Sequence, residues 1–222
     1  MSHTVHPYSH RLGIIRDWKS RWFGVGKKYV DCLKADTMVR GYIVKKLRGM
    51  HVSLVEIERG QKAFRVIVKT ARPGLIIGRN GEGTEKLRAD INKFIVSNKL
   101  NEDGIELKLE IEEIRSPESD ARIVAQQVVE ALEKRMPFRR VLKQTVEKVM
   151  ANRDVKGVRV RIGGRLNGAD MARTEELRRG QVPLQTFRAD IDFARERATI
   201  PQGDLGIKVW IYRGEIFEKD NK

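Results

Sequence analysis

Residues 73–88 read Pro-Gly-Leu-Ile-Ile-Gly-Arg-Asn-Gly-Glu-Gly-Thr-Glu-Lys-Leu-Arg, and this stretch decides the fold that the rest of the sequence predicts. It predicts a short helix, a loop from Gly78 to Gly81 and a longer helix. Two glycines three positions apart let the loop bend without Cβ clashes and let another backbone approach closely. The following helix offers free N–H groups and the positive end of its dipole, so the loop suits a phosphate chain.

Helices and strands are predicted in a regular order around this loop. Apolar residues such as Val30 and Leu33 recur near helical spacing before Gly49, which is typical of a helix and its end. Alternating and β-branched residues then predict strands. The predicted elements are a helix over 29–48, strands over 51–58 and 64–69 joined by a turn at 59–62, the two helices around the loop, the second over 82–97, and a strand over 105–112.

This order, with Gly-x-x-Gly between two helices, resembles a type II KH domain, a family whose loops clamp nucleic-acid backbone. Two nucleotide-binding alternatives fail: a Walker A loop needs Lys-Ser/Thr where Thr84 and Glu85 stand, and no Gly-x-Gly-x-x-Gly opens at Gly81. An ordinary turn between two helices remains the other alternative. We predict RNA-backbone contacts for Arg72, Gly78, Arg79, Asn80, Gly81, Lys86 and Arg88.

A second domain is predicted from Ser116 onward, where a capping hydroxyl, a proline and an early acid mark a helix start. Two helices, over 121–135 and 138–152, precede three alternating strands near 158–162, 187–193 and 207–211. Such a series favours two helices packed on an antiparallel sheet in two layers. The predicted fold class is α+β, with a basic N-terminal tail at 1–16, a type II KH domain at 17–115 and a C-terminal α+β domain at 116–222.

The 222-residue chain has a formal net charge of +15, which points to a polyanionic partner. Residues 1–49 hold 11 Lys and Arg against 3 acids, and residues 138–180 hold 12 against 5. The other segments, 50–137 and 181–222, are balanced at 15 against 15 and 7 against 7. Nucleic acid fits this distribution better than a membrane, because no lipid-facing amphipathic stripe accompanies the charge.

The single Cys32 excludes a disulfide framework and a multi-cysteine zinc site. No apolar run approaches the roughly 18 residues of a membrane span, and the polar start has no secretory signal pattern. We therefore expect a cytoplasmic protein with no membrane contact.

The predicted helix over 138–152 has an apolar face and, on the opposite side, the cations Arg139, Arg140 and Lys143. Positive charge at a helix N-terminus works against the helix dipole. This cost favours a functional interpretation, such as holding phosphates, over a solvated surface.

Further cations lie in the N-terminal region and along the predicted strand at 158–162. Trp18, Trp22 and Phe23 stand among them, and stacking on bases and packing within the protein stay open as alternatives. The cations predicted to contact RNA are Arg11, Arg16, Lys19, Arg21, Lys27, Lys28, Arg159, Arg161, Arg178 and Arg179.

Asp190 and Asp192 share one face of a predicted strand, and paired acids can bind a metal for nuclease chemistry. Ion pairs with Arg188 and with arginines of neighbouring strands are the stronger interpretation. We expect no metal and no cofactor.

Several dispersed segments resemble the family of the third protein of the small ribosomal subunit, bacterial type. They lie at 11–18, 20–23, 78–81, 138–140, 163–175, 182–184, 188–192 and 206–212. The resemblance implies a structural, non-enzymatic rRNA-binding protein in the subunit head, beside the mRNA entry channel, whose partners are small-subunit (16S-type) rRNA, mRNA and neighbouring head proteins.

Residue roles follow from the resemblance by motif position. Arg139, Arg140 and Lys143 correspond to basic residues that face incoming mRNA and support its unwinding. The segment from Gly164 to Arg173 corresponds to an rRNA-contacting surface, which assigns Gly164, Arg165, Asn167 and Arg173 to rRNA together with the cations named above. No homo-oligomer is expected.

The chain also departs from the family pattern. Its first residues differ from the usual start, the loop has Asn80 where cations are common, and the C-terminal extension of many relatives is nearly absent. Gly83 is expected to weaken the first turn of its helix. A metal-dependent KH-containing RNA-processing nuclease and a free KH RNA chaperone remain as alternative functions.

Overall fold

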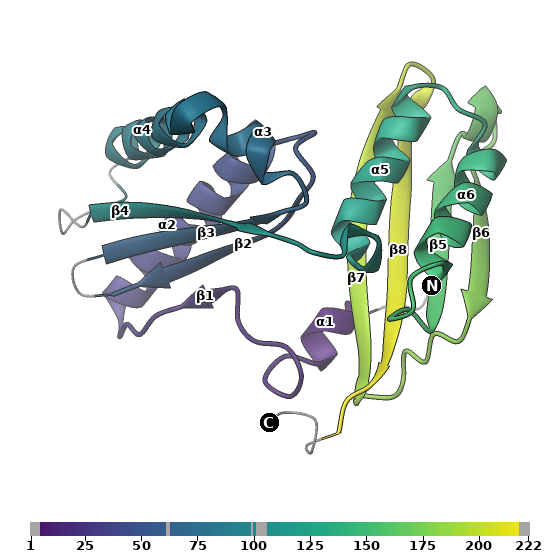
Figure 1. Ribbon diagram of the computed structural model, residues 1–222, viewed down its shortest axis with the longest axis horizontal. Coiled ribbons are helices and arrows are strands. Elements are labelled where there is room, and N and C mark those ends of the chain that lie inside the picture. Colours follow the sequence, from purple (N-terminus) through teal and green to yellow (C-terminus); the bar gives the residue numbers. More distant parts are fainter. Residues whose placement is uncertain (1–4, 61–62, 99, 101–105, 218–222) are drawn as a thin grey trace. The chain divides into compact units, whose positions relative to one another are not determined.

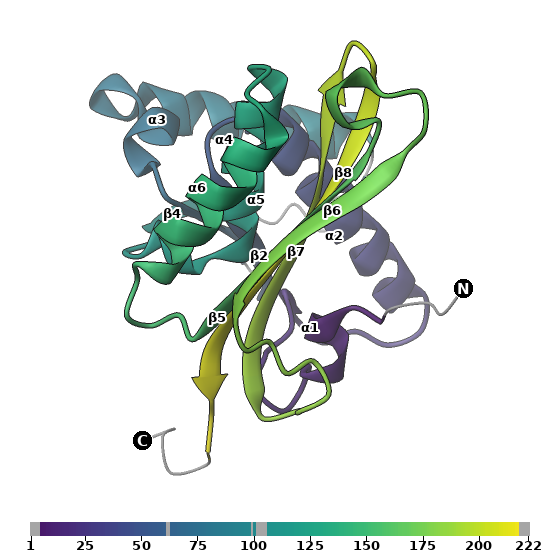
Figure 2. The same ribbon diagram turned by 90° about the vertical axis from the view of Figure 1, so that its right-hand side faces the viewer.

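The computed structural model describes residues 5–60, 63–98, 100 and 106–217. It divides into two compact units: the first unit comprises residues 18–115, and the second unit comprises residues 1–17 with residues 116–222. Figures 1 and 2 follow the chain through both units from two directions. The N-terminal segment predicted as a tail thus belongs, over its described residues, to the second unit.

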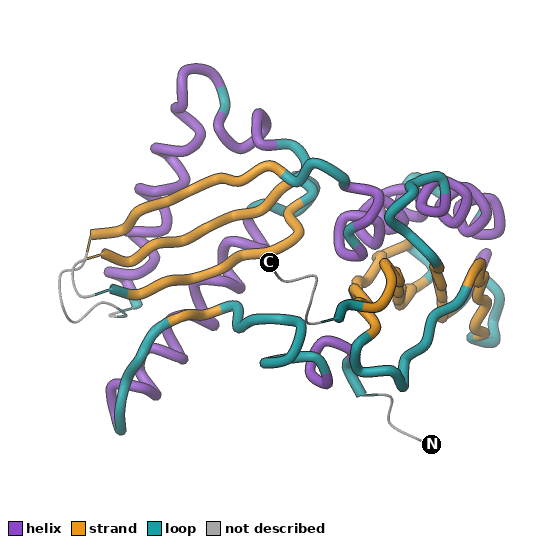
Figure 3. Tube along the Cα trace, turned by 60° about the horizontal axis from the view of Figure 1, so that its bottom comes forward, coloured by secondary structure: helices purple, strands orange, loops and turns teal. Residues whose placement is uncertain are grey.

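The first unit is a four-stranded sheet with strand order β1-β2-β3-β4, whose strands lie side by side in Figure 3. β2 and β3 are antiparallel, whereas β3 pairs in parallel with β4 and β1 in parallel with β2. The elements are β1 Ser20–Arg21, α2 Lys27–Lys46, β2 Val52–Arg59, β3 Ala63–Thr70, α3 Pro73–Ile77, the 3-10 turn η1 Arg79–Gly81, α4 Glu82–Ser97 and β4 Glu106–Glu113.

The two long helices of this unit share one core with the sheet. Val39 and Ile43 of α2 and Leu87 and Ile91 of α4 are all buried in it, together with the apolar residues of β2 and β3. Burial of these side chains is the main source of stability for the unit, because propensity alone stabilises an isolated helix weakly. The predicted KH order of helices and strands is confirmed.

Two details of the first unit differ from the sequence prediction. Val30 and Leu33, part of the spacing that predicts this helix, are 60% and 46% exposed, because the buried residues of α2 begin only at Ala35. β1 is too short, at two residues, to give a periodic signal. Part of the predicted turn at 59–62 and the predicted first residue of the strand at 105–112 fall outside the described residues.

The second unit is a four-stranded antiparallel sheet with strand order β6-β5-β8-β7. Figure 2 shows α5 and α6 on one face and α1 on the other. The elements are α1 Pro7–His10, the 3-10 turn η2 Pro117–Ser119, α5 Ala121–Glu133, α6 Phe138–Met150, β5 Gly157–Gly164, the 3-10 turn η3 Leu166–Gly168, β6 Arg173–Gly180, β7 Ala189–Ile200 and β8 Gly203–Glu215.

The predicted three strands of this unit are thus corrected to four, since β6 was missed. Its sequence, Arg-Thr-Glu-Glu-Leu-Arg-Arg-Gly, has one apolar residue, Leu177, which packs against the core between the sheet and the helices. An edge strand can carry many charges because one of its sides remains unpaired. Pairing with β5 along its whole length, which no local pattern encodes, makes it a strand.

The face of this sheet opposite the two helices is partly covered by the N-terminal segment. Ile191, Trp210 and Tyr212 form a small second core there, and His6 contacts Phe193 edge to face with ring centroids 4.7 Å apart. The N-terminal segment is therefore an integral part of the second unit. Further along the same face of the sheet, Arg195 is exposed and Lys208 and Arg161 are half-buried.

Candidate nucleic-acid interface

The glycine loop of the first unit has an unusual backbone. Gly78, Asn80 and Gly81 have φ of +70°, +51° and +83°, values that glycine and asparagine tolerate best. They let the chain leave α3, make the single turn η1 and enter α4 within a few residues. Arg79 and Asn80 are exposed at the tip of the loop.

Gly83, expected only as a weak point of α4, has a structural role that the sequence reasoning missed. A Cβ at this position would lie 2.4 Å from the carbonyl oxygen of Ile76 and 2.8 Å from that of Ile77. Both contacts are to backbone atoms of α3, so no side-chain rotation could relieve them. The missing side chain therefore allows α3 and α4 to approach closely enough to form the loop.

Cations surround the loop at several positions. Arg72 is exposed at the start of α3, and Arg88 is exposed on α4. Lys86 forms an exposed ion pair with Glu82 at 3.2 Å, which reduces the net positive charge beside the loop. The structure therefore presents all the predicted loop cations to solvent.

The predicted basic face of α6 is formed as expected. The helix buries Phe138, Val141, Leu142, Val146 and Val149 against the sheet. Arg139, Arg140 and Lys143 are exposed on its other side. Within the described residues, the side chains of Arg140 and Lys143 make no hydrogen bond or ion pair, so their charges face solvent uncompensated.

Arg139 belongs to a small cluster that bridges α6 and β6. Its guanidinium contacts both carboxylate oxygens of Glu175 at 3.4 Å, and Arg173 approaches the same carboxylate at 3.6 Å. Both guanidinium groups also lie over the Phe138 ring, at 5.7 and 5.9 Å from its centroid. The structure thus brings Arg173, predicted as a separate rRNA residue, next to the α6 face, and adds Glu175, which has no distinguishing sequence signal.

The two strand arginines Arg159 and Arg161 differ in their surroundings. Arg159 forms a 2.6 Å ion pair with Glu176 and stacks over the Trp210 ring, 4.9 Å from its centroid. Arg161 has no side-chain hydrogen bond or ion pair to any described residue. Of this pair, Arg161 is the one whose charge remains available.

The loop between β5 and β6 is shaped by the residues predicted to contact rRNA. The Arg165 side chain donates hydrogen bonds to the carbonyl oxygens of Ala169 and Gln202, at 3.0 and 3.1 Å. Asn167 has a φ of +56°, and a Cβ on Gly164 would lie 2.7 Å from the Leu205 side chain. These residues therefore hold the loop in shape, whether or not they also contact RNA.

The other predicted cations of β6 lie on its exposed edge. Arg178 donates to the carbonyl oxygen of Gly180 at 3.3 Å, and Arg179 is exposed. Both therefore remain accessible to a partner along the edge strand.

Complete burial of Arg11 in the second unit argues against its predicted contact with RNA. Its guanidinium donates hydrogen bonds to four carbonyl oxygens, those of Ala189, Pro7, Leu184 and Thr186, at 2.6, 2.9, 3.3 and 2.9 Å. Burial lowers the pKa of this guanidinium, while the charge of Asp190 opposes that change. Arg11 is a structural residue that fastens the N-terminal segment to the sheet.

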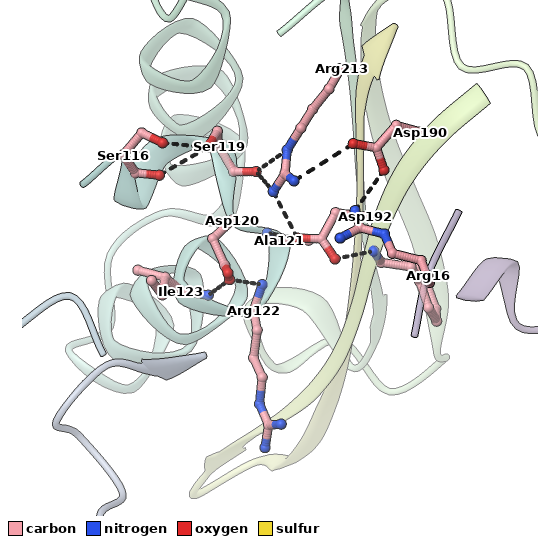
Figure 4. A network of polar contacts seen from close by, with 11 residues as sticks. Arg16, Ser116, Ser119, Asp120, Ala121, Arg122, Ile123, Asp190, Asp192 and Arg213 are labelled. Carbon is pink, nitrogen blue, oxygen red and sulfur yellow. Dashed lines mark hydrogen bonds and ion pairs between the residues drawn. The ribbon is translucent and has the colours of Figure 1, made fainter. Parts of the chain in front are cut away.

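The paired acids Asp190 and Asp192 are held by arginines, as Figure 4 shows. Arg16 contacts Asp190 at 2.6 Å, and Arg213 approaches Asp190 at 3.7 Å and Asp192 at 3.4 Å. Asp192 also accepts a 2.8 Å hydrogen bond from the backbone N–H of Ala121 at the start of α5. The pair is thus explained by structural ion pairs, although with Arg16 and Arg213 rather than Arg188.

The remaining predicted cations lie at the beginning of the first unit. Arg21 pairs with Glu56 and Glu58 of β2 at 3.6 and 3.2 Å. Lys19 is half-buried beside β1, and Lys27 and Lys28 are exposed in the first turn of α2. Both α2 lysines are therefore at the surface of the first unit.

Comparison with protein families matches both units of the chain. A model described as "KH domain" matches residues 38–119, and one described as "Ribosomal protein S3, C-terminal domain" matches residues 128–211. The two matches cover the glycine loop and the α6 face, respectively.

Curated relatives are similar along nearly the whole chain. "Small ribosomal subunit protein uS3" of Ectopseudomonas mendocina is 44% identical over 216 residues, covering 97% of this chain and 91% of the relative. The protein of the same name from Methylococcus capsulatus is 43% identical over 218 residues, covering 98% and 94%. That from Endomicrobium trichonymphae is 43% identical over 222 residues, covering 100% and 92%.

Helices of the described part of the chain are too short or too polar to cross a membrane. The same residues contain no group of three or more His, Cys, Asp or Glu side chains arranged to hold a metal ion.

Proposed function

We propose that this chain, which belongs to the family of small ribosomal subunit protein uS3, holds rRNA in the subunit head and faces mRNA at the entry channel. Membership makes it a structural protein of the small subunit with a KH RNA-binding domain, not an enzyme. The resemblance derived from the sequence is thereby confirmed. Its position in the head, its contact with mRNA and its role in unwinding remain proposals.

The exposed cations of α6 carry the proposal for mRNA. Arg139, Arg140 and Lys143 project from one helix, and Arg173 of β6 adds a further guanidinium beside them. Guanidinium groups bind phosphate through two parallel hydrogen bonds, which suits a backbone of any sequence. Positive charge at a helix N-terminus is unfavourable by itself, so a phosphate partner would offset that cost.

The glycine loop supports rRNA contact in the first unit. KH loops of the Gly-x-x-Gly type hold nucleic-acid backbone, and this loop presents Arg79 and Asn80 to solvent, while Arg72 is exposed at the start of α3. The paired Lys86 and the replacement of a cation by Asn80 reduce its charge. We therefore assign it one backbone contact and assign the stronger electrostatic contribution to the second unit.

The two alternative functions have less support. The nuclease alternative required Asp190 and Asp192 to hold a metal, but both carboxylates are occupied by Arg16, Arg213 and the backbone of Ala121. The free chaperone differs from the ribosomal role only in location. Sedimentation in a gradient at moderate salt distinguishes the ribosomal role from the free chaperone. If the chain is found only in the free fraction, the ribosomal role is rejected.

The mRNA proposal is tested with ribosomes that carry Arg139→Ala together with Arg140→Ala. We expect assembly close to normal, because Arg139 is 71% exposed and Arg140 is exposed, and several-fold slower translation of a hairpin-containing message relative to an unstructured one. A matched control removes two other exposed cations, Lys34→Ala with Arg153→Ala. Equal rates on both messages in the test variant would refute the entry-channel assignment.

A further inference from the structure

Three cations lie in one row on the face of the second sheet opposite α5 and α6. The strand register pairs Arg195 of β7 with Lys208 of β8, and Lys208 with Arg161 of β5. Their neighbours Ala194, Val209 and Val160 face the helices, so the alternation of a strand directs the three cations to the opposite face. Adjacent strands are about 4.8 Å apart, and the three charges therefore stand side by side.

None of the three side chains makes a hydrogen bond or ion pair with a described residue. The nearby acids form ion pairs with other arginines. Glu176, which lies directly across from Arg161, binds Arg159 instead. Asp204 binds Arg197 at 3.1 Å.

Glu196, between Arg195 and Arg197 in sequence, points to the helix side and binds Arg122 of α5 at 3.6 Å. Segment 181–222 is neutral by count, yet the acids of its described part are paired and the charges of Arg195 and Lys208 remain. Tertiary placement thus creates a cationic row that a count of charges along the sequence does not reveal.

Like charges directly opposite each other on a sheet are destabilising. The fold nevertheless places three of them together, next to Phe193, which His6 of the N-terminal segment contacts. The Glu176 carboxylate stands in register with Arg161 but is engaged by Arg159 at 2.6 Å, and it does not reach Lys208 or Arg195, so an anionic partner would neutralise these two charges. The row is therefore suited to a ligand with regularly spaced negative charges.

We infer that Arg195, Lys208 and Arg161 form a binding row for the phosphodiester backbone of RNA, an inference that rests on the proposed RNA-binding function of this chain. Arginine and lysine both bind phosphate well. Two aromatic rings flank the row, and neither is an open platform for base stacking: Trp210 is 4% exposed and lies under Arg159, and Phe193 is half-buried between His6 and Trp210. Contacts are thus made to the backbone and are independent of base sequence.

The test compares RNA binding by the full chain before and after Arg195→Gln with Lys208→Gln, two residues not used by the proposed mRNA face. The probe is fluorescein-labelled polyuridylate of 20 nucleotides, and its anisotropy is measured over a series of salt concentrations. We expect about tenfold weaker binding at low salt and a salt slope smaller by about 1.4, since each phosphate contact on a single strand contributes about 0.7. Lys34→Gln with Arg153→Gln, which removes the same charge from exposed positions elsewhere, should change affinity less than twofold.

If the test variant binds the probe like this control, the inference is overturned. Displacement of the RNA by polyglutamate of equal charge would also overturn it, because that result would indicate an acidic protein segment as the partner. If wild type itself fails to bind the probe, the proposed RNA-binding function fails first. The melting temperature of the test variant should not fall below that of wild type, because the substitution removes repulsion.

Reconstituted small subunits then distinguish the two sources of RNA. Poorer incorporation of the test variant identifies rRNA as the partner, and normal incorporation with weaker mRNA binding identifies mRNA. Wild-type behaviour in both measurements would exclude the row from the ribosomal role and overturn the inference.

Discussion

The two units present positive charge to solvent by different means. In the first unit the surface is a loop made by backbone conformation, with three residues at positive φ and a glycine that lets two helices approach. In the second unit the surfaces are made by arginine and lysine side chains on a regular helix and sheet. The loop therefore depends on backbone geometry, whereas the helix and sheet surfaces depend on which cations are left without acids.

The two units also differ in how their surface cations are paired with acids. On the sheet of the first unit, Arg65 pairs with Glu58 and Glu110, and Lys69 pairs with Glu56 and Glu112. Beside α6 of the second unit one acid, Glu175 of β6, pairs with two arginines, Arg139 and Arg173. Substitutions should accordingly affect stability in the first unit and binding in the second, with buried Arg11 as the exception.

Arg11→Ala should have the largest effect on stability. Arg11 is a buried structural residue, unlike the exposed arginines of the same unit to which we assign binding. Removing the buried guanidinium takes a donor from four carbonyl oxygens and creates a cavity, so we expect a loss of about 3 to 4 kcal/mol. Thermal unfolding, together with proteolysis of the N-terminal segment, measures it. Arg197→Ala, which removes an exposed ion pair, should change stability by less than about 0.5 kcal/mol, and equal effects of the two would contradict this division.

Gly83→Ala tests the dependence of the first unit on its backbone. The new Cβ would meet two carbonyl oxygens of α3 at 2.4 and 2.8 Å, so α3 must shift, at a cost of about 2 kcal/mol. Hydrogen exchange of α3 and α4 amides should show the loss.

Gly41→Ala is the matched control, because Gly41 lies in α2 and nothing would lie within 4 Å of its Cβ. There we expect a gain of about 0.5 to 1 kcal/mol. If both alanines were tolerated equally, close approach of the helices would not explain Gly83.

Glu175→Gln tests whether the acid beside α6 limits RNA binding by the second unit. The substitution frees Arg139 and Arg173 from their shared carboxylate, so binding of single-stranded RNA should strengthen by about threefold at low salt. The same anisotropy measurement detects it, with Glu147→Gln on the exposed side of α6, outside the cluster of Arg139, Arg173 and Glu175, as the control. Weaker binding by the test variant would show that Glu175 positions the arginines rather than competing for them.

Asp90→Asn should have the smallest effect. The hydrogen bond from Lys46 lowers the pKa of Asp90, so its contribution to stability is present above the unfolded pKa, about 3.9, and is lost as pH falls through the lower folded pKa. Both groups are exposed enough for solvent and salt to screen the pair. Melting temperatures of the variant and wild type should differ slightly at neutral pH and converge near pH 2, and a difference that grew in acid would contradict the assigned sign.

Local patterns in the sequence predicted much of the first unit and of the α6 face. Helical spacing, strand alternation and the Gly-x-x-Gly loop act over a few residues, so the order of elements and the exposure of Arg139, Arg140 and Lys143 could be read directly. The resemblance to a ribosomal family was also carried by short segments in sequence order, and the comparisons confirmed it.

The features that only the tertiary structure decided involve residues that are distant in sequence. The burial of Arg11 depends on carbonyl groups more than 170 residues away, and β6 is a strand because it pairs with β5. The role of Gly83 depends on the approach of α3, and the row of Arg161, Lys208 and Arg195 depends on the register of three strands. Spacing and turn chemistry are local properties of a chain, whereas burial, ion pairing and strand register arise only when distant segments pack together.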